Sequence, residues 1–424
     1  MELKAIVFPL ILIISLPLCL HGIMELNPIP AEVDLGVLQG NSARTYLEVS
    51  NTGTAEHSYS LFQVPETVRT QQLAYYPFDG IYDDLFTCTN GTIVNMPFVE
   101  DKDSHVDSAV YFDGYAKYTT RDFAVQNDFS VSFWAKPVST QNMYSQSYSN
   151  APMYANYLIG PEWGGTSNWG GFGIALGTNG IMLMEHGHGY MPCLLSYSAN
   201  LSGWHHYTVT FTNHAPKLYL DGTLVRTGIS SQRSYTRLSH EIGSYVYGSY
   251  SGHLDELCVF NSPLSQAQVN DMYSFDRGSR YIISPQIGTI AAGASQNLML
   301  NMIDTSLPLG SYTDTYILCQ GGDAPEYRLI SVETVVTDRG PLAPDAVTIL
   351  KLPNGDVQLQ WLPVTQDTYG AAFTPTRYRI YRANTPGSMD SYTEIGQSSG
   401  TQYVDSFNPL LPAQPMKFYL IRAE

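Results

Sequence analysis

Apolar and polar residues alternate in the middle of the chain, and this period of two predicts strands. In the segment 129–135 the apolar positions are Phe129, Val131, Phe133 and Ala135. The positions between them hold Ser130, Ser132 and Trp134. Because successive side chains of a strand point to opposite faces, we expect antiparallel sheet with one buried face and one polar face.

A second alternating run, at 207–212, precedes a turn signal. Leu218 and Leu220 lead into Asp221-Gly222, and Thr223 follows. An Asp-Gly dipeptide between two apolar runs predicts a two-residue hairpin, since such a turn needs positive φ. The return strand is therefore expected to begin at Thr223.

Composition extends this interpretation to the whole chain. The 424 residues suffice for two to four domains, and only 14% of them are charged. Runs of Lys, Glu or Ala are scarce, so long helices are not expected and the sequence predicts an all-β protein. The net charge of −17 argues against nucleic acid or an anionic membrane as a partner.

An apolar run follows Lys4 near the N-terminus. It covers residues 5–20, too few for a comfortable membrane span, and predicts a secretory signal over 1–22. No second apolar run is long enough to span a bilayer, so we expect a secreted or cell-surface protein without a membrane span. A disulfide among Cys88, Cys193 and Cys258 is one expectation for an exported chain, and buried free thiols are the other.

Several short segments between residues 71 and 277 carry a family resemblance. In order they are LAYYPFDG (73–80), NGTIVN (90–95), SAVYFDG (108–114), the strands and hairpin above, GHLDELCVF (252–260) and SPLSQAQVNDMY (262–273). Together they resemble the LamG-like jelly-roll domains of the concanavalin A-like lectin/glucanase superfamily. The resemblance implies a two-sheet sandwich with a helical turn after its last strand. Members bind glycans, bind proteins or act as passive modules, so the fold alone does not settle function.

The flanking segments carry two further resemblances. Residues 23–70, with an Asn-Thr-Gly turn, and residues 278–338 resemble the two halves of a bacterial Ig-like sandwich of the abnormal-spindle type. The LamG-like domain is then inserted in a loop of that sandwich, which is tolerated where the inserted ends lie close together. After a linker at 339–343, residues 344–424 resemble a fibronectin type III domain. The predicted fold is therefore three antiparallel β-sandwich domains.

Catalytic residues are not predicted. A glycoside hydrolase needs two carboxylates across a cleft, and the nearest acidic pair is Asp255-Glu256. Adjacent residues on a strand point to opposite faces, so this pair is not expected to act as a dyad. Patterns for serine hydrolases and nucleotide-binding loops are absent from the sequence.

Calcium is the cofactor that the LamG-like resemblance implies, at a sheet edge where the first and last strands meet. The ion takes six to eight oxygen ligands. The candidate ligands are Asp79, Asp83, Asp84 and Asp255. The alternative is that these aspartates cap turns.

A long aromatic segment, 144–169, is the candidate binding surface. It is nearly uncharged and mixes Tyr and Trp with Asn, Ser and Gly, which suits sugar rings and also protein contacts. The expected ligand contacts are Tyr157, Trp163, Trp169 and Tyr190. A loop that packs on itself is the alternative.

The sequence thus predicts a non-catalytic, modular protein whose LamG-like domain binds an extracellular glycan or surface protein, with the other domains as spacers. The alternatives are a polysaccharide-degrading hydrolase or its accessory subunit, and a purely structural surface component.

Overall fold

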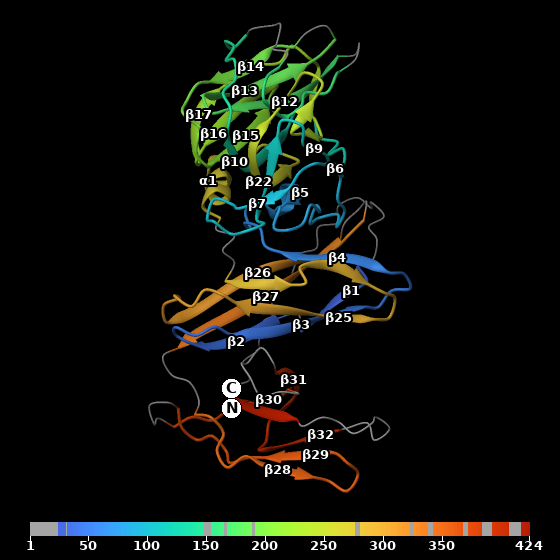
Figure 1. The fold of residues 1–424 in the computed structure, drawn as a ribbon, viewed down its shortest axis with the longest axis vertical. Coiled ribbons are helices and arrows are strands. Elements are labelled where there is room, and N and C mark those ends of the chain that lie inside the picture. The colour runs from blue at the N-terminus through green and yellow to red at the C-terminus, as the bar shows by residue number, and fades with distance from the viewer. Residues whose placement is uncertain are drawn as a thin grey trace, which may run out of the picture.

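The structure is a computed structural model. It describes residues 24–30, 32–147, 154–164, 168–188, 191–275, 280–322, 326–337, 342–367, 372–383, 392–406 and 417–424. The described residues form strands with one α-helix and one short 3-10 turn, η1 (Arg69–Gln71), so the predicted all-β class is confirmed. The predicted signal segment, 1–22, lies outside the described residues. Figure 1 shows three bodies stacked along the long axis: an inserted domain (72–275) at one end, a host sandwich (24–62 and 281–337) in the middle and a C-terminal body (348–424) at the other end.

The inserted domain has two large sheets. The first sheet runs in the order β17-β16-β15-β10-β22-β8-β7, and β5 also pairs with β22. Its strands are β5 (Gln72–Tyr76), β7 (Phe98–Val99), β8 (Ala109–Asp113), β10 (Phe129–Pro137), β15 (His205–Thr212), β16 (Ala215–Leu220), β17 (Thr223–Thr227) and β22 (Ser251–Phe260).

The second sheet runs in the order β14-β13-β12-β11-β19-β9-β6, and β18 lies parallel to β12. Its strands are β6 (Thr92–Val94), β9 (Lys117–Thr119), β11 (Tyr157–Ile159), β12 (Trp169–Gly177), β13 (Gly180–His186), β14 (Cys193–Tyr197), β18 (Tyr235–Leu238) and β19 (Glu241–Ile242). A small hairpin, β20 (Ser244–Tyr245) and β21 (Gly248–Ser249), forms a separate two-stranded sheet.

The predicted apolar positions of β10 are all fully buried in the core of the inserted domain. Phe129 stacks on Phe211 of β15 with ring centroids 5.3 Å apart, and its edge meets Phe172 of the second sheet. The predicted hairpin is also confirmed, since β16 and β17 flank Asp221 (φ 48°) and Gly222 (φ 79°).

The expected polar face of β10 is not a solvent face. Ser130 and Ser132 are fully buried. The Ser130 hydroxyl donates to the Ser262 carbonyl (3.0 Å) and accepts from the Leu264 amide (2.9 Å), so it anchors the segment that enters α1 (Gln266–Ser274). Ser265 caps this helix, which confirms the predicted helical turn after the last strand. The prediction of one buried face is wrong because α1 covers the second face here.

The host sandwich is built from strands on both sides of the inserted domain. One sheet runs β1-β3-β25-β23, with β1 (Leu26–Ile29), β3 (Arg44–Asn51), β25 (Ser295–Met302) and β23 (Tyr281–Ser284). The other runs β2-β27-β26-β4-β24, with β2 (Glu32–Leu38), β27 (Glu326–Thr337), β26 (Gly310–Gln320), β4 (His57–Phe62) and β24 (Ile287–Ile290). Leu47 of β3 lies opposite Leu298 of β25, and both side chains are fully buried. Neither segment alone could cover these apolar faces.

The inserted domain and the host sandwich share an apolar core. Phe62 of β4 packs against Tyr75 and Phe86 with ring centroids 5.8 and 5.1 Å apart, and Ile317 and Cys319 of β26 join the same cluster. The Cys319 thiol donates to the Phe86 carbonyl at 3.0 Å. The junction is therefore packed like a domain interior, which holds the two bodies in a fixed relation.

The C-terminal body pairs two small sheets. One has β28 (Thr348–Lys351), β29 (Val357–Gln360) and β32 (Gln402–Asp405), and the other has β31 (Thr393–Ser398), β30 (Tyr378–Ala383) and β33 (Phe418–Ala423). Trp361 is buried beside Tyr378, and Tyr419 packs on the edge of this cluster.

Candidate functional site

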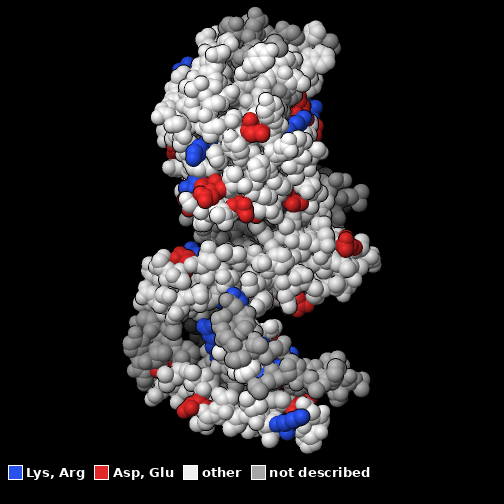
Figure 2. Space-filling view, viewed as in Figure 1, with Lys and Arg blue, Asp and Glu red and all other residues white. Residues whose placement is uncertain are grey.

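A cleft of about 460 Å3 opens where the inserted domain meets the host sandwich, at the waist that Figure 2 shows between the two bodies. From the inserted domain it is lined by Tyr75, Asp79, Asp101, Lys102, Asp103, His105, Ser108, Trp134, His206, Glu256, Met272 and Phe275. From the host it is lined by Phe62, Gln63, Tyr281, Ile282, Ile283, Gln286, Ile303 and Tyr316. Charged groups thus come from one wall and apolar groups mainly from the other.

Trp134 and Lys102 form the centre of the polar wall. Trp134 lies on β10, on the face that also carries Ser130 and Ser132, and its ring is half-buried. The ammonium of Lys102 sits 5.2 Å from the centroid of this ring and also contacts the Asp103 carboxylate. The arrangement combines a cation–π contact with an ion pair.

The loop that carries Lys102 is held by Asp101. One carboxylate oxygen of Asp101 accepts hydrogen bonds from the amides of Asp103 (2.8 Å) and His105 (2.9 Å), and the other lies 2.9 Å from the His105 ring nitrogen. Partial burial would raise the pKa of Asp101, but these hydrogen bonds outweigh it and lower the pKa below its ordinary value. Asp101 therefore stays ionised and keeps the loop in shape at neutral pH.

Glu256 enters the cleft through a β-bulge. On β22 the register with β10 shifts between Ser132 and Trp134, and Glu256 adopts φ 58°, which is unusual for a residue with a Cβ. The Tyr75 hydroxyl lies 3.2 Å from both carboxylate oxygens of Glu256. The bulge breaks the strict alternation that was expected for Asp255 and Glu256.

His206 closes the floor of the cleft. Its ring nitrogen lies 2.9 Å from the Ser132 hydroxyl, and its ring centroid is 5.3 Å from that of Trp134. Burial lowers the pKa of His206 to about 4, although Asp221 acts in the opposite direction. The imidazole is therefore neutral at pH 7.

The predicted aromatic surface is only partly present. Tyr157 is fully buried against Met182 and Met184, so its ring offers no face to a ligand, and the prediction is corrected at this position. Burial also raises its pKa. Tyr190 lies outside the described residues.

The two tryptophans of that prediction remain near the surface. Trp163 is 55% exposed, and its ring centroid is 6.4 Å from that of His188. Trp169 is half-buried, and the guanidinium of Arg237 covers its ring at 5.4 Å. Of these two rings, that of Trp163 is the largely open one, and ligand binding there stays a prediction.

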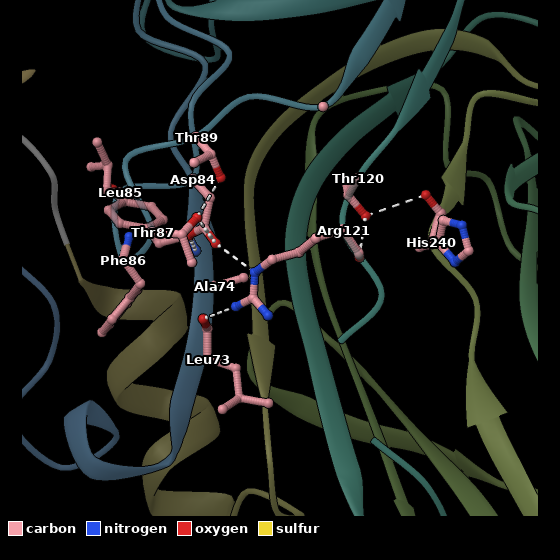
Figure 3. A network of polar contacts seen from close by, with 12 residues as sticks. Leu73, Ala74, Asp84, Leu85, Phe86, Thr87, Thr89, Thr120, Arg121 and His240 are labelled. Carbon is pink, nitrogen blue, oxygen red and sulfur yellow. Dashed lines mark hydrogen bonds and ion pairs between the residues drawn. The ribbon is translucent and has the colours of Figure 1, made fainter. Parts of the chain in front are cut away.

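Asp84, a predicted calcium ligand, is instead the centre of an internal hydrogen-bond network (Figure 3). Its carboxylate accepts from the amides of Tyr75 (3.0 Å) and Phe86 (3.1 Å), from the Thr87 hydroxyl (3.1 Å) and from Arg121 Nε (3.1 Å). Burial raises the pKa of Asp84, and Arg121 and the amides partly offset this. Protein donors occupy the oxygens that a calcium ion would need.

The other three predicted calcium ligands do not complete a site with Asp84. Asp79 is exposed, Asp83 is half-buried, and Asp255 is buried within β22. Within the described ranges, the only cluster of three acidic, His or Cys groups spaced for a metal ion is Asp101, Asp103 and His105. The four predicted residues therefore do not fit the oxygen cage that calcium requires in this structure, and calcium binding itself stays a prediction.

The four described cysteines, Cys88, Cys193, Cys258 and Cys319, are free thiols. Burial raises the pKa of Cys88 and of Cys193 to about 12, so neither is a reactive thiolate at neutral pH. The sequence left open a disulfide or free thiols in the LamG-like region, and the structure has free thiols there.

Sequence reasoning missed the cleft residues. One signal was present, because Trp134 interrupts the polar face begun by Ser130 and Ser132. A large aromatic ring on such a face points to a covering partner or to a ligand. Glu256 gave no signal, since nothing in its local sequence marks a bulge.

Comparison with known families places part of the inserted domain. Residues 110–270 match the family model described as the concanavalin A-like lectin/glucanases superfamily, which confirms the predicted resemblance over that range. No curated protein matches the chain. The Ig-like and fibronectin type III resemblances, and the domain boundaries, stay predictions.

Similar solved structures are distant. Domain 4 of AbnA, a GH43 extracellular arabinanase from Geobacillus stearothermophilus in complex with arabinotriose, is 20% identical, and the match covers 48% of this chain and 98% of that chain with a TM-score of 0.34. The binding domain of Botulinum neurotoxin DC was matched in a complex with SialylT (9% identity, 84% and 94% coverage, TM-score 0.35) and with rat synaptotagmin II (10%, 84% and 100%, TM-score 0.36). These similarities are too weak to transfer a ligand or a site to this chain. Among the described residues, no helix has the length and apolar character needed to cross a bilayer.

Proposed function

We propose that this chain is a non-catalytic, exported binding protein that holds a glycan in the cleft between its inserted domain and its host sandwich. The observation that carries the proposal is the half-buried ring of Trp134, set in the cleft among charged side chains. Aromatic faces pack on the C–H surfaces of sugar rings, while polar groups bond to their hydroxyls.

The size and stiffness of the cleft support a small, specific ligand. Its volume of about 460 Å3 lies in the range of about 300–1,000 Å3 typical of small-molecule sites. The apolar core shared by Phe62, Phe86 and Ile317 holds its two walls together, so little ordering is needed when a ligand binds.

The engagement of the cleft carboxylates by protein groups supports a binding role without catalysis. Both Glu256 oxygens lie within hydrogen-bond distance of the Tyr75 hydroxyl, and Asp101 is engaged by its own loop. We therefore expect incubation with a bound oligosaccharide to release no reducing ends. Release that is lost in Glu256→Gln would instead establish the hydrolase alternative.

A glycan array with the full chain tests the binding proposal. We expect Trp134→Ala to weaken the best-bound glycan by about tenfold, a loss of about 1.4 kcal/mol. Trp163→Ala is the matched control, because this ring is more exposed and does not line the cleft. A loss in Trp163→Ala with none in Trp134→Ala would move the site to the surface first predicted from the sequence.

Export is tested separately, by the N-terminal sequence of the protein recovered from outside the cell. We expect it to begin close to residue 23, after the predicted signal segment.

A further inference from the structure

The cleft is unbalanced in charge. Four carboxylates line it, from Asp79, Asp101, Asp103 and Glu256, against the single ammonium of Lys102. His206 adds no positive charge at neutral pH because burial keeps its imidazole neutral. A partly enclosed site with excess negative charge favours a ligand that carries positive charge.

Lys102 already shows how an ammonium is stabilised in this cleft. Its Nζ lies over the Trp134 ring, at 5.2 Å from the centroid, and touches the Asp103 carboxylate. The Lys102 side chain is 29% exposed and that of Asp103 is 49% exposed, so the contact is open to solvent. Such partly exposed contacts are weak, so a ligand can displace this ammonium at small cost.

The opposite wall suits a sugar ring. Ile282 and Ile303 of the host line the cleft while 54% and 46% exposed, and they offer apolar contact area across from Trp134. A volume of about 460 Å3 is more than a single lysine side chain would fill, and it leaves room for a pyranose ring between the walls.

We propose that the cleft selects glycans with a free amine, and that the ammonium of an amino sugar takes the place of Lys102 Nζ over Trp134 and beside Asp103. This inference rests on the proposed glycan-binding function of the same cleft and names its ligand class. Lys102 then acts as a built-in competitor that the ligand must displace.

The competitor role predicts an unusual sign for one substitution. Lys102→Met keeps most of the apolar side chain and removes the ammonium, so it frees both the Trp134 face and Asp103. Affinity for an amino sugar should rise by about three- to fivefold, whereas an acidic glycan should lose its only ammonium partner and bind more weakly. Asp103→Asn should weaken the amino sugar by a similar factor. Lys217→Met, on β16 and away from the cleft lining, is the matched control and should change neither affinity.

Calorimetric titration of the full chain would use three tetrasaccharides, built from glucosamine, N-acetylglucosamine and galacturonic acid. We expect the glucosamine tetrasaccharide to bind most tightly. Its affinity should rise in Lys102→Met, fall in Trp134→Ala and stay unchanged in Lys217→Met. Preference for the acetylated or acidic tetrasaccharide, or weaker glucosamine binding in Lys102→Met, overturns the amine selectivity.

The same titrations separate this inference from the proposed function. Trp134-dependent binding of a neutral or acidic glycan leaves the cleft a glycan site but refutes amine selection. No Trp134-dependent saccharide binding refutes both. A lysine-containing peptide that binds as tightly as the glucosamine tetrasaccharide would refute the assignment to sugars.

Discussion

The guanidinium of Arg121 donates from Nε to the carboxylate of Asp84 at 3.1 Å, and from Nη2 to the Leu73 carbonyl at 2.6 Å. Asp84 is 1% exposed and precedes the turn at Cys88, whereas Arg121 follows β9 of the second sheet. This ion pair therefore joins the start of the first sheet to the second.

Removing Arg121 should leave a buried carboxylate without its counter-charge. We expect Arg121→Met to lower the free energy of unfolding by about 3 kcal/mol, as for other broken buried pairs. Urea denaturation followed by tryptophan fluorescence measures the loss. Glu66→Gln is the control, since Glu66 is 86% exposed and lies 3.9 Å from Arg69; it should change stability by less than about 0.5 kcal/mol. Equal effects of the two substitutions would contradict a special role for Arg121.

Chelation tests the calcium prediction on the same residues. A bound ion stabilises the folded state, so its removal lowers the melting temperature. Because Asp84 is occupied by protein donors, we expect any fall in melting temperature on chelation to be the same in Asp84→Asn as in the wild type. A clear fall that is absent in Asp84→Asn would restore Asp84 as a calcium ligand.

His206 should make stability depend on pH. Its pKa is about 4 in the folded chain and about 6.5 when unfolded, so the native state binds fewer protons between these values. Stability is therefore fully present above pH 6.5 and is lost as the pH falls toward 4, by on the order of 2–3 kcal/mol. In His206→Gln, whose amide can still bond to Ser132, this part of the pH dependence should disappear. Denaturation midpoints of the wild type and of His206→Gln at pH 7, 5.5 and 4.5 measure this pH dependence. If the two midpoints fall in parallel with pH, the prediction for His206 is refuted.

Gly222 is required at the second position of the hairpin turn. Its φ is 79°, and an added Cβ would lie 3.1 Å from Tyr273 and 3.3 Å from Asn270 of α1. We expect Gly222→Ala to cost about 1–2 kcal/mol. Gly203→Ala is the control, because the φ of Gly203 is not positive and an added Cβ there would lie 4.0 Å from His205 Nε2. The hypothesis fails if both variants unfold at the same urea concentration.

Phe62 should couple the stability of the two bodies. It is 2% exposed and belongs to the host, yet its ring neighbours, Tyr75 and Phe86, belong to the inserted domain. Phe62→Ala should cost about 3–5 kcal/mol and should split the unfolding transition in a calorimetric scan. Phe211→Ala, inside the inserted domain alone, should lower stability without separating the transitions. A single transition in Phe62→Ala would show that the junction does not couple them.

Features fixed by neighbouring residues could be predicted from the sequence. The alternation of β10, the Asp221-Gly222 turn and the helix that Ser265 caps depend on backbone geometry and a few local hydrogen bonds. Local chemistry is visible in local sequence, so these elements were found where they were expected.

The site could not be predicted because it depends on contacts between distant segments. Lys102 meets Trp134 only because a loop between β7 and β8 lies against β10, and the other wall comes from the host. The sequence also gave no reason for the bulge that turns Glu256 into the cleft. Tyr157 was wrongly predicted to contact a ligand, because the polar, loop-like sequence around it hides its place in a buried strand.

The interrupted host sandwich has a consequence for the order of folding. The Asn51 side-chain amide donates to the Ile290 carbonyl at 2.8 Å across 239 positions of sequence. Closing so long a loop in an unfolded chain is slow and costs entropy. Once the inserted domain has folded, its ends near β5 and α1 lie at the same junction, and the host strands become near neighbours. We therefore expect the host sheets to form only after the inserted domain, so a substitution that slows the inserted domain should delay both.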